Sequence, residues 1–311
     1  MRLLRWLANA LAPLTLAGAG AAYLAPEWFL PVGGYFLWLF AATMFALGVV
    51  LEPADLRDTL TRPRAIGLGV LAQYSIMPLL GFAAAWASGL PEALALGFVI
   101  VGCAPGAMAS NVIVYLAGGA VAYSVALTTV ATVLSPLFTP VLVETLGGTF
   151  LPIPFWPMMA TIVKTVLLPL LAGMAARRFL RGRRLDLAEA AAPAMATLAI
   201  VVICSYAVAA NQARLAQIGP TVFALVVGLN ALGYLLGWQA GRLFGFDGRH
   251  RLTLSIEIGM QNAGLGVALA LEHFRPETAL PGALFAVWCI LTSAGVTTAL
   301  RSRAVPARAA A

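Results

Sequence analysis

The amino-acid sequence predicts an all-α membrane protein with ten helical spans, and its composition, its pattern of apolar runs and its arginine placement support this. Hydrophobic residues make up 61% of the 311 positions, and only 10% are charged. The mean hydropathy is +0.93. A water-soluble domain of this length does not carry so much apolar sequence, so the composition places the chain in a lipid bilayer, as one transmembrane domain over residues 1–311.

Ten apolar runs are long enough to cross a hydrocarbon core, which needs about 20 residues of helix. The first follows Arg2 and Arg5 and resembles a signal peptide, but an even number of spans favours a membrane helix there. The expected spans cover residues 8–25, 33–51, 64–87, 92–117, 120–146, 156–179, 190–209, 217–244, 249–272 and 279–301.

The arginines predict the orientation of these spans. If the N-terminus is cytoplasmic, 16 arginines fall on the inner side, and only Arg214 and Arg275 fall on the outer side. This asymmetry follows the positive-inside rule. We therefore expect a multi-pass protein of the inner (plasma) membrane with both termini in the cytoplasm. The net charge of +7 then reflects membrane topology, and no nucleic-acid partner is expected.

The two halves of the chain resemble each other at an offset of 156 residues. The run Leu-Leu-Gly-Phe at 79–82 recurs as Leu-Leu-Gly-Trp at 235–238, and Gly89 recurs as Gly245. Each half would contain five spans, an odd number, so the second half would enter the membrane upside down. This predicts two inverted repeats, over about 8–146 and 156–301, an arrangement typical of secondary transporters.

Two of the expected spans are interrupted by residues that do not suit a continuous apolar helix. The fourth contains Pro105 and Gly106, and the ninth contains Glu257, Gln261 and Asn262 among several glycines. A carboxylate at membrane depth is costly and indicates a functional site, and irregular backbone is tolerated there where it lines a site. We expect helices four and nine to be broken and to cross.

Several oxygen-bearing side chains are predicted to lie near this crossing. Ser110 and Asn111 follow the first break, Ser124 and Thr128 share one face of span five, and Gln73 lies in span three. Single hydroxyls in membrane helices usually bond to their own backbone. Together with Glu257 they form an oxygen-rich set with one negative charge, which suits a hard cation such as Na⁺. A proton carried by Glu257 alone is the alternative.

The remaining polar and reactive residues do not indicate an enzyme. The only lysine, Lys164, is expected to extend toward the outer interface, or else to attract an anionic solute. The three cysteines, Cys103, Cys204 and Cys289, fall within apolar runs without metal-ligand spacing. The sequence contains no phosphate-binding loop, zinc-protease motif or Ser/His/Asp set.

At these residues the chain is similar to the bile acid:sodium symporter family, including its bacterial members, over nearly its full length. The motifs that carry the resemblance are P-G-A-M-A-S-N-V-I-V-Y-L-A-G-G at 105–119, A-Y-S-V-A-L-T-T-V-A-T-V-L-S-P at 122–136 and S-I-E-I-G-M-Q-N-A-G-L-G at 255–266. The resemblance implies a panel domain of helices 1, 2, 6 and 7. The core domain would contain helices 3–5 and 8–10.

The resemblance also implies two sodium sites that share Glu257. The first would use Ser110, Asn111, Ser124, Thr128 and Glu257. The second would use Gln73, Glu257, the backbone carbonyls of Ile258 and Met260, and Gln261. Asn262 and the helix start around Met108 and Ala109 would face the solute's carboxylate or sulfonate, because helix N-termini attract anions.

Two departures from the family pattern make the solute uncertain. Met108 stands where many members have a polar residue such as Thr, and Trp288 is followed by Cys289 and Ile290 where many have a His-Asn pair. Both changes are expected near the solute cavity.

The expected function is sodium-coupled symport of an organic anion by alternating access, with two Na⁺ as coupling ions and no cofactor. The solute would be bile-acid-like or a small carboxylate such as pantoate. A proton-coupled carrier that uses Glu257 and a membrane receptor or channel are the alternatives, and the oligomeric state is not predicted.

Overall fold

The computed structural model describes residues 6–7, 10–51, 63–289, 291–293 and 295, and the described residues fold into helices without a β-strand. The predicted all-helical class is confirmed. The helices are α2 (Leu11–Leu24), α3 (Phe36–Val50), α5 (Pro63–Ala87), α6 (Glu92–Cys103), α7 (Ser110–Ala117), α8 (Val121–Leu142), α9 (Phe155–Ile162), α10 (Leu168–Arg177), α11 (Arg183–Ala209), α12 (Gln212–Leu243), α13 (Gly248–Gly259) and α14 (Ala263–His273). Short 3-10 turns η1 (Pro26–Trp28), η2 (Leu30–Gly34) and η5 (Pro276–Ala279) and π-helical segments η3 (Val143–Gly147) and η4 (Val163–Leu167) connect or extend them.

Five continuous helical segments are long and apolar enough to cross a membrane: Pro63–Ala87, Val121–Gly147, Phe155–Arg177, Arg183–Ala209 and Gly219–Leu243. A sixth candidate joins Pro26–Gly34 to Phe36–Val50 through a bend of 75°. Glu92–Cys103 and Ala263–His273 are apolar but shorter.

Two helices begin earlier than the sequence predicted. α11 starts at Arg183 rather than at 190, and α12 starts at Gln212 rather than at 217. Hydropathy locates the part of a helix that suits the hydrocarbon, whereas the backbone hydrogen bonds continue beyond it into polar residues. The first turn of α11 accordingly contains two arginines and Asp186.

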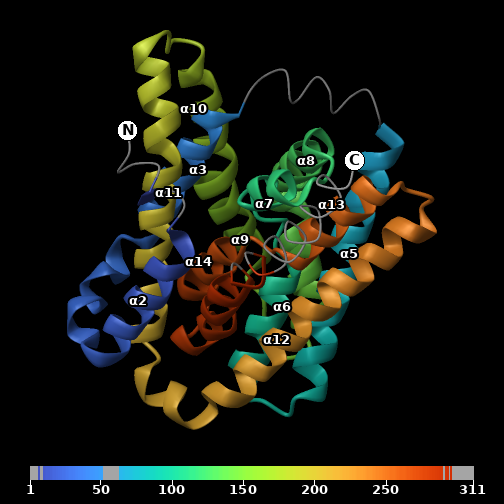
Figure 1. The fold of residues 1–311 in the computed structure, drawn as a ribbon. Coiled ribbons are helices and arrows are strands. Elements are labelled where there is room, and N and C mark those ends of the chain that lie inside the picture. The colour runs from blue at the N-terminus through green and yellow to red at the C-terminus, as the bar shows by residue number, and fades with distance from the viewer. Residues whose placement is uncertain (1–5, 8–9, 52–62, 290, 294, 296–311) are drawn as a thin grey trace, which may run out of the picture.

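The helices form two packed groups (Figure 1). In the first, α3 contacts α10 and α11, and α11 also contacts α2. Gly48 of α3 and Gly173 of α10 let these two backbones touch, because a Cβ atom at either position would lie 2.2 Å or less from a carbonyl oxygen of the other helix. Small residues at helix contacts allow such close packing in membranes. In the second group, α5 contacts α6, α8 and α12, and α13 contacts α5, α7, α8 and α12.

The 156-residue offset seen in the sequence recurs in helix ends and helix contacts. It places the whole of α6 on the whole of α13, and the last residues of α5 and α7 on the last residues of α12 and α14. Gly89 and Gly245 both have positive φ, 62° and 73°. A Cβ atom at Gly81 would lie 2.5 Å from the Phe98 carbonyl oxygen, and one at Gly237 would lie 3.0 Å from the corresponding oxygen of Leu254. The α5–α6 and α12–α13 pairs therefore pack alike.

Candidate ion and solute site at two broken helices

The two interrupted segments break where the sequence indicated, and the breaks meet. α6 ends at Cys103, where Pro105 follows, and α13 ends at Gly259. Gly106 and Gln261 form an antiparallel bridge. The N–H of Ala107 donates to the Met260 carbonyl at 2.9 Å, and the N–H of Asn262 donates to the Pro105 carbonyl at 2.8 Å. Each break thus supplies hydrogen-bond partners that the other lacks within an apolar region.

Side chains from other helices complete the broken ends. Thr139 of α8 donates to the Cys103 carbonyl at 2.9 Å, and Asn230 of α12 donates to the Gly259 carbonyl at 2.8 Å. The Asn262 side chain caps α14 by accepting from the Leu265 N–H at 3.1 Å. The last carbonyls of a helix have no partner inside it, so these bonds satisfy groups that would otherwise be buried unpaired. Sequence reasoning missed Thr139 and Asn230, since nothing in their spacing sets them apart.

Glu257 lies at the centre of the first predicted ligand set. Its side chain is buried, and Oε1 accepts from the hydroxyls of Ser110, at 2.6 Å, and Ser124. Oε2 accepts from Thr128 at 2.6 Å. Asn111 joins the cluster because its Oδ1 accepts from Ser124 at 2.7 Å. Helices α7, α8 and α13 therefore bring all five residues of this set together.

Each of the three hydroxyls in this cluster also reaches a second acceptor. Ser110 lies 2.6 Å from the Ala107 carbonyl, Thr128 lies 2.9 Å from the Ser124 carbonyl, and Ser124 reaches Asn111. A hydroxyl carries one proton and two lone pairs, so it donates either to the carboxylate or to this second acceptor. In the second arrangement the hydroxyl lone pairs are available near the carboxylate.

No basic side chain bonds to Glu257 among the residues that the structure describes. A buried carboxylate is stable only when a cation or a proton neutralises it. The cluster is therefore suited to receive one of the two.

The second predicted ligand set is also assembled. Gln73 donates to Gln261 Oε1 at 2.9 Å, and Gln261 donates to the Ile258 carbonyl at 2.9 Å. Gly106 lies between this set and Glu257: a Cβ atom there would lie 3.1 Å from Glu257 Oε2 and 4.0 Å from Gln73 Oε1. Glycine allows the two sets to approach, a role the sequence did not reveal.

A cavity of about 340 Å³ lies beside the breaks, between α3 and α11 on one side and α7 on the other. It contains the three residues predicted to face the solute, Met108, Ala109 and Asn262, together with Asn111. The opposite wall is mainly apolar, with the hydroxyl-bearing residues Thr43 and Thr197. Among the described residues, no charged side chain lines the cavity.

The lysine and the three cysteines noted in the sequence do not line the cavity. Lys164 is exposed on η4 and does not line the cavity. The three cysteines are free and buried, as expected. Cys289 was expected near the solute cavity, but it does not line it; its thiol is buried and donates to the Ala286 carbonyl at 3.5 Å. Ile290 and the terminal arginines Arg2, Arg5, Arg301, Arg303 and Arg308, with Arg57 and Arg62, lie outside the described residues.

The sequence matches the model of the sodium bile acid symporter family over residues 37–218. It is 38% identical over 273 residues to the uncharacterized sodium-dependent transporter YocS of Bacillus subtilis. The aligned residues make up 88% of this chain and 85% of that protein. It is 35% identical over 246 residues to the probable chloroplastic sodium/metabolite cotransporter BASS1 of Arabidopsis thaliana, which covers 79% of this chain and 61% of the plant protein. The rice cotransporter BASS2 is 32% identical over 265 residues, which cover 85% of this chain and 63% of that protein.

The chain thus spans most of the bacterial relative and about three-fifths of the plant relatives. These relatives are named as transporters or cotransporters, and several helices of this chain are long and apolar enough to cross a membrane. The chain is a multi-pass membrane protein of a transporter family rather than an enzyme, and it belongs to the sodium bile acid symporter family.

Proposed function

We propose that this chain is a sodium-coupled symporter of a small organic anion. The observation that carries the proposal is the buried Glu257 carboxylate, which three hydroxyls surround and to which no basic side chain bonds in the described part of the chain. Its relatives are named as sodium-dependent transporters and sodium/metabolite cotransporters, which supports sodium over other cations.

The first sodium ion would bind among Glu257, Ser110, Ser124, Thr128 and Asn111. When the hydroxyl protons turn to their second acceptors, five side chains present oxygen to one point with a single negative charge. Several oxygens with little net charge are the ligands that a hard monovalent or divalent cation prefers. The protein would then bind sodium by reorienting protons, without moving helices.

The second sodium ion would bind between Glu257, Gln73, Gln261 and the carbonyls of Ile258 and Met260. The Ile258 and Met260 carbonyls each accept one hydrogen bond, and a carbonyl oxygen has a second lone pair for an ion. Two sodium ions beside one carboxylate leave one positive charge. That charge would attract an anion into the adjacent cavity, and symport with a monovalent anion would then be electrogenic.

The solute's carboxylate or sulfonate would face the starts of α7 and α14. In the described part of the chain the N–H groups of Met108 and Ala109 have no hydrogen-bond acceptor, and Asn262 lies at the start of α14. Helix N-termini attract anions because their N–H groups point outward. The mainly apolar opposite wall would hold the solute's body, and a volume near the low end of ligand sites favours a small carboxylate over a bile acid.

Transport would proceed by alternating access between a panel and a core. The panel would consist of α2, α3, α9–α10 and α11, and the core of α5–α8, α12–α14 and the helix that begins at residue 280. Two inverted repeats with ten spans, the broken pairs α6–α7 and α13–α14 each counting as one, would form this domain in the inner membrane. The shared 156-residue offset supports the repeats, and the arginine distribution supports cytoplasmic termini.

The test is thermal unfolding of the purified protein in NaCl and in KCl at equal ionic strength, for the wild type and for Glu257→Ala. A bound ion stabilises the folded state by about 2.7 kcal/mol at 100 times its dissociation constant. We expect sodium to raise the midpoint temperature of the wild type and not of the variant. Sodium-driven uptake of anionic solutes into proteoliposomes then identifies the solute. An equal midpoint in both salts for the wild type would refute sodium coupling.

Proton coupling is the second candidate, because a proton on Glu257 would also neutralise the carboxylate within its hydroxyl cluster. It predicts solute uptake driven by a pH gradient in sodium-free buffer. Uptake that requires sodium at every pH would exclude it.

A further inference from the structure

The first turn of α13 is unusually basic for the start of a helix. Asp247 caps the helix by accepting from the His250 N–H at 2.9 Å, but Arg249, His250 and Arg251 follow directly. Cations are unfavourable at a helix N-terminus, where the helix dipole is positive. His250 pairs with Asp247 at 2.9 Å, whereas the two arginines bond to carbonyls outside α13.

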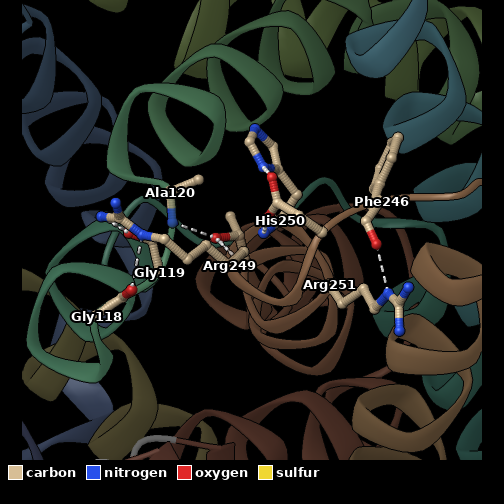
Figure 2. Close-up of polar contacts among 9 residues, drawn as sticks. Gly118, Gly119, Ala120, Phe246, Arg249, His250 and Arg251 are labelled. Carbon is tan, nitrogen blue, oxygen red and sulfur yellow. Dashed lines mark hydrogen bonds and ion pairs between the residues drawn. The ribbon is translucent and has the colours of Figure 1, made fainter.

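Arg249 finds its partner at the end of α7. Figure 2 shows its guanidinium extended toward the turn that joins α7 to α8. Nε donates to the Gly118 carbonyl at 3.2 Å, and Nη2 donates to the Gly119 carbonyl at 3.1 Å. A cation at a helix C-terminus satisfies unpaired carbonyls and opposes the negative end of the dipole. Arg249 therefore ties the end of α7 to the beginning of α13.

Thr253, one turn further along α13, holds the start of α8. Its hydroxyl accepts from the Ala120 N–H at 2.8 Å and donates to the Arg249 carbonyl at 2.8 Å. A Cβ atom at Gly119 would lie 2.7 Å from this hydroxyl, so only glycine lets the turn pass so closely. The turn 118–120 is thus bound by two side chains of α13.

These contacts continue directly into the ligand cluster. Ala120 contacts Thr253, and Ser124, four residues later on α8, contacts Glu257, four residues later on α13. Four residues are about one helical turn, so the two contacts lie on successive turns of α8 and α13. The hydrogen bond between Ala120 and Thr253 therefore fixes how α8 is aligned along α13, and this alignment brings Ser124 to Glu257.

α7 depends on α13 in the same way. It has only 8 residues, too few to be stable without tertiary contacts. At its start Ser110 contacts Glu257, and at its end the Gly118 and Gly119 carbonyls contact Arg249. Both ends are anchored to one helix, and the position of Ser110 and Asn111 follows from those anchors.

We propose that Arg249 and Thr253 are positioning residues that set the cation affinity of the Glu257 cluster by fixing α7 and α8 against α13. This proposal rests on the proposed sodium binding at that cluster. Neither residue contacts the ion, and both act through the helices that carry its ligands.

Arg251 supplies the matched control. It lies in the same turn of α13, but its Nε donates to the Phe246 carbonyl in the α12–α13 turn and not to the turn 118–120 (Figure 2). Its removal deletes a guanidinium–carbonyl bond of the same kind without freeing α7 or α8.

The experiment titrates NaCl against KCl at constant ionic strength and records the half-saturating sodium concentration from the unfolding midpoint. Thr253→Val is expected to raise that concentration roughly five- to tenfold, the effect of one hydrogen bond, and Arg249→Gln, which loses two bonds nearer the surface, to raise it by a similar factor. Thr253→Ser keeps the hydroxyl and is expected to have the wild-type half-saturating sodium concentration. Arg251→Gln is expected to lower the midpoint in KCl while leaving the half-saturating concentration unchanged.

A structural role alone would give a different pattern. Thr253→Val and Arg249→Gln would then lower the unfolding midpoint, as Arg251→Gln does, but leave the half-saturating sodium concentration at the wild-type value. In that case the positioning proposal is wrong and sodium coupling stands. If the wild type itself does not respond to sodium, the proposed function fails first. Should Thr253→Val not fold, Arg249→Lys, which keeps the charge and loses the paired donors, carries the same test.

Discussion

The two broken helices do the same structural task with different residues. In the first, residues 104–109 separate α6 from α7, and Pro105 and Gly106 interrupt the helix by removing a backbone donor and a side chain. In the second, only residues 260–262 separate α13 from α14, without glycine or proline, and the Asn262 side chain starts the new helix.

The two breaks also contribute different chemical groups to the site. The first break and the helix that follows it supply neutral groups: the Ser110 hydroxyl, the Asn111 amide and the space at Gly106. The second supplies the only carboxylate of the cluster, Glu257, and the amide of Gln261. The two breaks therefore have a similar backbone arrangement, and the groups that they supply are complementary.

The largest expected effect comes from removing one proposed oxygen ligand from each of the two proposed sodium sets. Ser124→Ala affects the first proposed sodium set and Gln261→Leu the second. A hydrogen-bonding group lost beside a charge costs about 1.5–3 kcal/mol, so sodium half-saturation is expected to rise roughly 10- to 150-fold in either variant. Sodium titration of solute uptake should show a Hill coefficient above one in the wild type and near one in each variant.

The control for these ligand variants is Glu277→Gln, which removes a second buried carboxylate that lies near Arg275. Its sodium response is expected to match the wild type. A Hill coefficient near one in the wild type would contradict two coupled sodium ions.

Gly106→Ala tests the space that only the first break provides. The new Cβ atom would lie 3.1 Å from Glu257 Oε2, a carboxylate that Thr128 already holds, so the cluster must shift by a few tenths of an ångström. We expect about a tenfold weaker sodium response, comparable with one lost hydrogen bond. Gly67→Ala, where a Cβ atom meets nothing within 4 Å, is the control. Equal sodium affinity in the two variants would show that Gly106 is not limiting.

The capping side chains of the two broken ends differ in kind: one is an amide that joins α12 to two other segments, and the other is a hydroxyl. Asn230 donates to the Gly259 carbonyl and also accepts from Thr292 at 2.9 Å, whereas Thr139 donates to the Cys103 carbonyl. Asn230→Leu is therefore expected to destabilise the protein more than Thr139→Val, with both losses about 0.5–2 kcal/mol. Chemical unfolding in KCl measures both. The reverse order would mean that the first break depends more on its cap.

The smallest effect concerns the start of the second broken helix. Asp247 caps α13, and at the equivalent position α6 begins after Pro91 without a side-chain cap. Hydrogen bonds from the His250 N–H and side chain lower the pKa of Asp247 below its usual value. A lowered carboxyl pKa gives stability that is present above the unfolded pKa and lost as the pH falls through the folded pKa. Asp247→Ala should thus lower the unfolding midpoint slightly at about pH 5 and above, and this difference should begin to shrink near about pH 4 and continue to shrink as the pH falls through the lower, folded pKa.

The two breaks, and the polar side chains expected near them, could be predicted from the sequence because several of those residues conflict with apolar surroundings. Pro105 and Glu257 are costly in apolar helices, and the i, i+4 spacing of Ser124 and Thr128 places both on one face. In the structure Ser124 and Thr128 both bond to Glu257, and the Pro105 carbonyl accepts from the Asn262 N–H of the other break.

The supporting contacts could not be predicted in the same way. Thr139, Asn230, Thr253 and Arg249 are ordinary residues in ordinary places, and their roles depend on which carbonyl or N–H of another helix lies opposite. That information arises from packing between distant segments. The starts of α11 and α12 were misplaced for a related reason, since hydropathy detects the bilayer rather than the end of a hydrogen-bonded helix.

The bridge between Gly106 and Gln261 has a consequence for the order in which the protein is made. These residues are 155 positions apart in the chain. At ordinary rates of synthesis the ribosome needs roughly 8–30 s to produce that length. During this interval the N–H of Ala107 and the carbonyl of Pro105 have no partner from the second half. The first break is therefore synthesised with these backbone groups unpaired by the second, and the bridge can form only after the segment around Gln261 has been made.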